Sequence, residues 1–133
     1  MANENNFVYF EGAKVTKTRS KIYYRIDLED EDWSFFIKKE IVKGIISSSV
    51  EEESNLVAIM LAYVEYSRQC RNECRESKKA KKLEDDILIN GFSALLYSYP
   101  VERLVVIFKS LKWHEITEIL NSEDPISKME GII

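Results

Sequence analysis

The sequence predicts a single α+β domain over residues 1–133: an antiparallel β-meander of three to four strands in residues 1–38, a region of four to five helices around a central long helix in residues 39–121, and a C-terminal tail in residues 122–133. Three observations predict it. Apolar and polar residues alternate before Lys38, apolar residues recur at helical spacing after it, and the stretch Leu56–Tyr66 carries only one charge. Strands followed by helices are typical of an α+β domain.

The strands are expected in the aromatic run Phe7–Phe10, in Ala13–Thr18, in a third segment that ends at Leu28 and in a fourth that begins at Trp33. The third has the clearest alternation, which predicts that one face packs on the helices: Ile22, Tyr24, Ile26 and Leu28. The acidic run Glu29–Asp32 is expected to be an exposed turn.

The central helix is expected to contain Leu56–Tyr66, because this stretch is rich in helix formers and has neither Gly nor Pro. Glu51–Glu53 suits a helix N-terminus, and Ser49 with Glu52 fits a capping box. A helix that is apolar on all sides must be covered on most sides. Its polar continuation, with no helix breaker through Lys82, predicts that the helix projects beyond the core.

The remaining helices follow from apolar periodicity. A short helix is expected at Ile41–Ile46, and another over Leu83–Tyr99, although Asn90-Gly91 also favours a hairpin. Ser98 as cap and Pro100 in the first turn begin the next helix, and Trp113 opens the last. The tail from Ser122 is expected to fray unless Ile126, Met129 and the last two residues dock.

Composition limits the classes of function. The net charge of −4 and the pI near 5.2 argue against a generic nucleic-acid binder. Two cysteines, Cys70 and Cys74, are too few for a disulfide framework, and with His114 they give fewer than the four ligands of a zinc site. We therefore expect no cofactor, no metal and no catalytic residues. The N-terminus has no signal-peptide pattern, so a cytoplasmic location is expected.

A basic row is the first candidate binding site. Between Arg68 and Lys82, seven basic residues stand against Glu73 and Glu76, a local charge of +5. Six of them share one side of an expected helix: Arg68, Arg71, Arg75, Lys78, Lys79 and Lys82. Such a row suits phosphates or an acidic protein surface. The alternative is a solvated helix end without a binding role.

Acidic clusters and aromatic residues give further candidates. The turn residues Glu29, Asp30, Glu31 and Asp32, together with Glu51–Glu53, could occupy a basic groove on a partner, or be only a polar turn and a helix start. Tyr23 and Phe36 are expected on the outward face of the sheet. A helix-turn-helix at Val101–Leu120 is disfavoured, because its second helix carries Glu115 and Glu118 and little positive charge.

The leading hypothesis is therefore a non-enzymatic intracellular interaction protein that binds a protein partner, such as a nucleoprotein complex, through charged surfaces and exposed aromatics. A compact acidic chain of this kind is typical of inhibitors or regulators that phages or other mobile elements encode. The alternatives are a nucleic-acid-binding accessory protein that uses residues 68–82, and a small enzyme without a recognisable motif. No membrane contact is expected, and a homodimer is compatible with the sequence.

The basic row generates a first prediction. Arg71→Glu with Arg75→Glu should melt like the parent, because substitutions at exposed sites usually change stability by about 0.5 kcal/mol or less. It should no longer bind an acidic partner, since like charges across an interface are costly. Thermal melts and a binding titration test this. Unfolding of the variant would mean that the arginines are structural.

Overall fold

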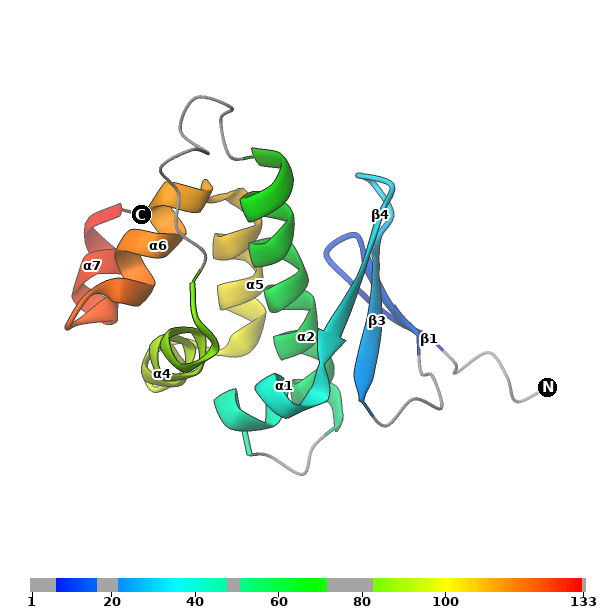
Figure 1. Cartoon of the computed structure of the whole chain (residues 1–133), viewed down its shortest axis with the longest axis horizontal. Helices are drawn as coiled ribbons and strands as arrows, with labels where there is room; N and C mark the ends of the chain where they lie inside the picture. Colours follow the sequence, from blue (N-terminus) through cyan, green and yellow to red (C-terminus); the bar gives the residue numbers. More distant parts are fainter. Residues whose placement is uncertain (1–6, 17–21, 48–50, 72–82, 133) are drawn as a thin grey trace.

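The structure is a computed structural model that describes residues 7–16, 22–47, 51–71 and 83–132. Its strands are β1 (Phe7–Phe10), β2 (Ala13–Thr16), β3 (Tyr23–Leu28) and β4 (Trp33–Lys38). Its helices are α1 (Lys39–Ile45), α2 (Glu51–Tyr66), the π-helical turn η2 (Ser67–Arg71), α4 (Asp85–Leu96), α5 (Val101–Ser110), α6 (Trp113–Asn121) and α7 (Pro125–Ile132). The predicted α+β fold with an N-terminal meander is confirmed (Figure 1).

The four strands form one antiparallel sheet in the order β1-β2-β3-β4. Ile26 lies opposite both Val15 and Phe35, so the predicted apolar face of β3 is shared by its neighbours. The buried residues of this inner face are Ala13, Val15, Tyr24, Ile26, Leu28, Phe35 and Ile37. The meander therefore has one dry face, as the alternation predicts.

The prediction for Ile22 is wrong, because this side chain is 62% exposed. Ile22 precedes the first residue of β3, and its carbonyl accepts the backbone N–H of Lys39, which already belongs to α1. The ladder ends at this point. Alternation shows to which face of the sheet a side chain points. It does not show whether the helices still cover that face at the end of the strand.

Helix α2 lies between the sheet and α5 (Figure 1). Every residue from Val57 to Val64 is buried, which confirms that the apolar stretch is a central helix. The expected cap at Ser49 and the continuation of the helix beyond Arg71 lie outside the described residues. Within them, the end of the helix is the π-helical turn η2.

Helix α4 contains the Asn90-Gly91 dipeptide, which confirms helix over hairpin. A Cβ atom on Gly91 would lie 2.6 Å from Leu120 Cδ2 and 3.4 Å from Leu120 Cα. Gly91 is therefore explained by the close approach of α4 to α6.

The C-terminal half differs from the expectations at two places. Pro100, rather than Ser98, is the N-cap residue of α5, and no side chain caps that helix. For the tail, the stated condition for order is met, since Met129 is fully buried; what the apolar spacing does not predict is that the tail forms the helix α7. Asp124 accepts hydrogen bonds from the backbone N–H and the hydroxyl of Ser127, and these bonds lower the pKa of its carboxyl group. Asp is favoured at the position that caps the start of a helix, and Pro is favoured at the first helical position.

The turn between β1 and β2 fastens the sheet to the helices. Glu11 and Gly12 both have positive φ, of 50° and 81°, as a two-residue type I′ turn requires. The carbonyl of Glu11 accepts hydrogen bonds from the Tyr63 hydroxyl at 2.5 Å and from Lys109 Nζ at 3.1 Å. One backbone oxygen thus joins the hairpin to α2 and α5.

The sheet register predicts opposite results for two neighbouring tyrosines. Tyr24 is 9% exposed and Tyr23 is 37% exposed. Tyr24→Asp buries an unpaired carboxylate, which should cost about 3 kcal/mol or more. Tyr23→Asp should cost about 1 kcal/mol or less because its site is solvated. Thermal melts of the two variants test this, and equal shifts would contradict the register.

Candidate functional site

The outer face of the sheet is the face that points away from α2. The ladder register places nine described side chains on it: Tyr9, Lys14, Thr16, Tyr23, Arg25, Asp27, Ser34, Phe36 and Lys38. Tyr9 is 61% exposed and Phe36 is 64% exposed. Large aromatic side chains on a solvated face are the kind of surface through which proteins bind partners.

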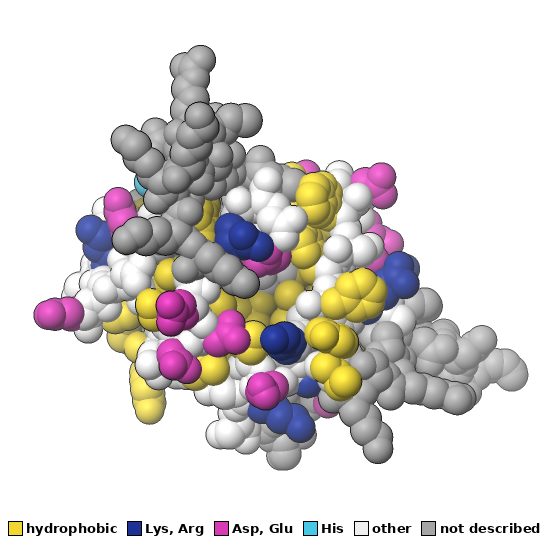
Figure 2. Space-filling view, in the orientation of Figure 1, with side chains coloured by type: hydrophobic (Ala, Val, Ile, Leu, Met, Phe, Trp, Pro, Cys, Tyr) yellow, Lys and Arg dark blue, Asp and Glu magenta, His cyan; other side chains and the backbone are white. Residues whose placement is uncertain are grey.

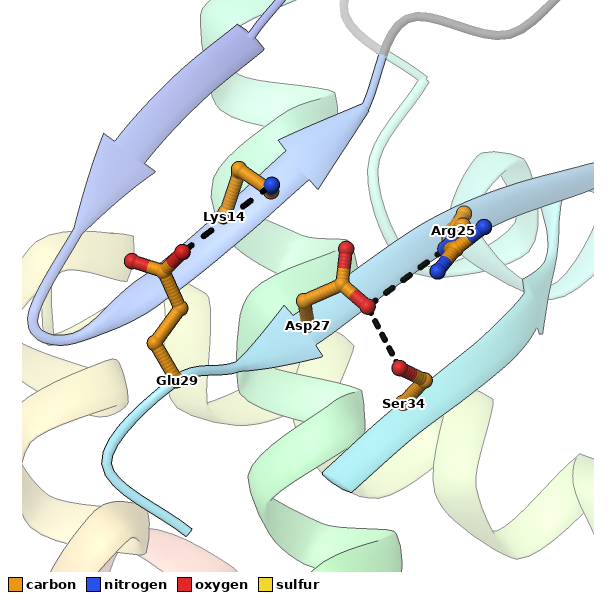
Figure 3. Close-up of polar contacts among 5 residues, drawn as sticks. All are labelled: Lys14, Arg25, Asp27, Glu29 and Ser34. Carbon is orange, nitrogen blue, oxygen red and sulfur yellow. Dashed lines mark hydrogen bonds and ion pairs between the residues drawn. The ribbon is translucent and has the colours of Figure 1, made fainter. Parts of the chain in front are cut away.

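The centre of the outer face is a polar cluster. Asp27 Oδ1 accepts a hydrogen bond from the Ser34 hydroxyl at 2.5 Å and lies 3.4 Å from Arg25 Nε (Figure 3). On the neighbouring strand, Lys14 Nζ lies 3.9 Å from a carboxylate oxygen of Glu29. Each of these two cations therefore has a carboxylate beside it.

Tyr23 and Phe36, both expected to point outward, do so and contact each other. Their ring centroids are 6.3 Å apart and the rings meet edge to face at 79°. Such a pair is favourable beyond the area it buries. A partner that contacts one ring would therefore also meet the other.

The acidic turn, residues Glu29–Asp32, connects β3 to β4 at the same end of the sheet as the β1–β2 turn. Its residues are exposed, as predicted, and Asp32 has a positive φ of 56°. The Tyr66 hydroxyl donates a hydrogen bond to Glu31 at 2.6 Å, so the turn is tied to the end of α2. It is an exposed acidic turn with a contact to α2.

Of the basic row, only the side chain of Arg68 is described. It forms a two-point ion pair with Glu65, in which Arg68 Nε lies 3.2 Å from Oε1 and Nη2 contacts Oε2. Arg71 is in the π-helical turn, where the α-helical spacing that aligned the row does not apply. The other residues of the row, Arg75, Lys78, Lys79 and Lys82, lie outside the described residues.

A groove follows the edge of β4 that no described strand pairs with, and it has a volume of about 380 Å³. Phe35, Phe36, Ile37 and Lys38 line one side. The opposite side is formed by residues of α2, α4 and α6, among them Val64, Leu88 and Trp113. The indole Nε1 of Trp113 is buried without a hydrogen-bond partner. Figure 2 shows hydrophobic side chains between charged ones on this side of the molecule.

Potential metal ligands are scattered among the described residues. No group of three or more His, Cys, Asp or Glu among them could hold a metal ion. His114, the one histidine of the chain, is exposed on α6, and the buried Trp113 beside it could not reach a DNA base. Burial, and then the charge of Glu51, raise the pKa of Tyr24, against a hydrogen bond with Ser54 that lowers it. Tyr24 therefore stays neutral at physiological pH.

Comparison of the chain with protein-family models, with curated proteins and with solved structures finds no match. No described helix has the length and apolarity that crossing a membrane would need.

Two features of these surfaces have little or no signal in the sequence. The cluster of Arg25, Asp27 and Ser34 can be predicted only in part. Alternation places Arg25 and Asp27 on the outer face, but which residue of β4 lies opposite Asp27 depends on the length of the turn. The groove has no signal in the sequence, because its walls come from four separate segments.

The cluster generates a prediction. Asp27→Ala should lower the free energy of unfolding by about 1 kcal/mol, because the carboxylate holds both a hydroxyl and a guanidinium on a partly solvated face. Ser34→Ala should cost less, and the double variant should show a coupling of about 0.5 kcal/mol or more. Urea unfolding of the four proteins measures this. A coupling of zero would mean that the Asp27–Ser34 hydrogen bond contributes nothing in solution.

Proposed function

We propose that this chain is a non-enzymatic interaction protein that binds a partner protein through the outer face of its sheet. The observation that carries the proposal is the exposure of Tyr9, Tyr23 and Phe36 around the ordered polar cluster of Arg25 and Asp27. Tyrosine and arginine are enriched at the energetically important positions of protein interfaces.

The charges of the outer face favour a protein over a nucleic acid. Lys14 and Arg25 each lie beside a carboxylate, at 3.9 Å and 3.4 Å. Phosphates would have to compete with these carboxylates, whereas a protein surface can offer both signs of charge. The basic row remains the basis of the alternative, a nucleic-acid-binding accessory role.

A regulator or inhibitor role fits this proposal, because such a protein acts by occupying a surface on another macromolecule. The acidic turn supplies a second contact. It carries four adjacent carboxylates and is tied to α2 through Tyr66. An exposed negative turn on the same sheet as the aromatics could enter a basic groove on a partner and speed its association.

The test is affinity capture from native host cells with quantitative mass spectrometry. The double variant Tyr23→Asp with Arg25→Glu should lose the captured partner by about tenfold or more, as expected when two central contacts of an interface are removed. The matched control is Val106→Asp with Arg103→Glu on α5, which lies across α2 from the sheet (Figure 1). It should capture like the parent.

Equal capture by all three proteins would place the partner surface elsewhere. Nuclease treatment of the lysate and a salt titration with single-stranded DNA and RNA separate the nucleic-acid alternative. We expect no tight binding to either, and a steep loss of binding between 50 and 200 mM salt would favour that alternative instead.

A further inference from the structure

The edge of β4 that no described strand pairs with enters the proposed function only through the side chain of Phe36, and its backbone groups have no role there. In the described chain, β4 is the last strand of the sheet and pairs only with β3. Its six residues follow the register without interruption. A regular edge strand without Pro or a bulge is a template for pairing with another strand.

The backbone groups that face outward from this edge can be identified. The N–H of Lys39 donates to the carbonyl of Ile22, so this pair is a hydrogen-bonded one. Because such pairs alternate along an antiparallel ladder, Phe35 and Ile37 also face β3. The N–H and C=O groups of Ser34 and Phe36 and the N–H of Lys38 therefore face away from β3, toward the groove side of the edge.

The geometry points to a second copy of this chain as the occupant of this edge. We propose that two chains associate about a two-fold axis through Phe36, with β4 antiparallel to β4 of the partner copy. Phe36 then pairs with its own counterpart, and Ser34 lies opposite Lys38. In this register the backbone N–H and C=O groups that face outward on one copy meet those that face outward on the other. No two lysines lie opposite each other.

The side chains agree with this pairing. On the inner side, Phe35 of one copy lies opposite Ile37 of the other, and the groove beside the edge leaves space for apolar side chains. On the outer side, the two Phe36 rings, each 64% exposed, meet at the axis. The two sheets would form one continuous sheet of eight strands with both helical layers on the same side.

Charge complementarity favours a second copy over an unrelated strand. The acidic turn immediately precedes β4. The end of β4 and the start of α1 form a basic segment of net positive charge, with Lys38, Lys39 and Lys43 outnumbering Glu40. Antiparallel pairing brings the acidic turn of each copy near the basic segment of the other. The chain itself supplies both halves of this contact, and the two-fold axis repeats it.

Light scattering during size exclusion tests the association. The parent should elute as a dimer of twice 15.6 kDa, about 31 kDa, at micromolar concentration. Phe36→Asp should shift it to the monomer and stay folded by circular dichroism, because its site is exposed in the single chain. Val106→Asp, an equivalent change at another exposed apolar site, should remain a dimer. The dissociation constant should rise at least severalfold in 1 M NaCl because the charge contact is solvent-exposed.

Cysteine cross-linking tests the register. Phe36→Cys should form a linked dimer on oxidation, because residues in a hydrogen-bonded pair lie about 5.5 Å apart, within the range of a disulfide. Ser34→Cys alone should not cross-link beyond the parent, which carries Cys70 and Cys74 and serves as the blank. An equal mixture of Ser34→Cys and Lys38→Cys should form the linked dimer again.

A parent that stays monomeric up to about 100 μM, well above the affinities of stable dimers, overturns the proposal. A dimer that survives Phe36→Asp and does not cross-link through Phe36→Cys also overturns it, because the copies then meet elsewhere. Neither measurement involves an external partner, so either result leaves the proposed function to its own test.

Discussion

A helix with no polar side has to be covered all round, and the arrangement of this molecule follows from how α2 is covered. The sheet lies against one side of it and α5 against another, and all residues from Val57 to Val64 are buried between them. The sheet can bury one face only, since no described element lies over the other. The need to cover α2 therefore fixes which face of the meander is dry and which is available to a partner.

That division gives the outer face its chemistry. Its charged residues remain in water, but Asp27 holds both Arg25 and Ser34 and Glu29 lies near Lys14, so the face carries both signs at short range. Exposed ion pairs contribute little to stability. Beside the exposed aromatic rings they present both signs of charge, and such a pattern favours specific recognition more than net charge does.

The parts of this fold that local patterns determine could be predicted from the sequence. Alternation in β3 gave the dry face, and the apolar run at Leu56–Tyr66 gave the central helix. Alternation wrongly predicts a buried Ile22, because it does not show where the cover of helices over the sheet ends. Asn90-Gly91 was ambiguous because its place in a helix depends on Leu120, a distant residue. The helix α7 had a local signal in Asp124-Pro125, which the apolar spacing did not reveal. The groove beside β4 could not be predicted, because it exists only once four distant segments have packed.

The hydrogen bond from Lys109 to the carbonyl of Glu11 spans 98 positions of the chain. It has a consequence for synthesis on the ribosome. The meander emerges first, but its apolar face has no cover until α2 emerges, and α2 in turn needs α5. Neither half can reach its final packing before the segment around Phe108 has left the exit tunnel. During that interval the nascent sheet presents both an apolar face and an unpaired edge, which are the features that chaperones and aggregation act on.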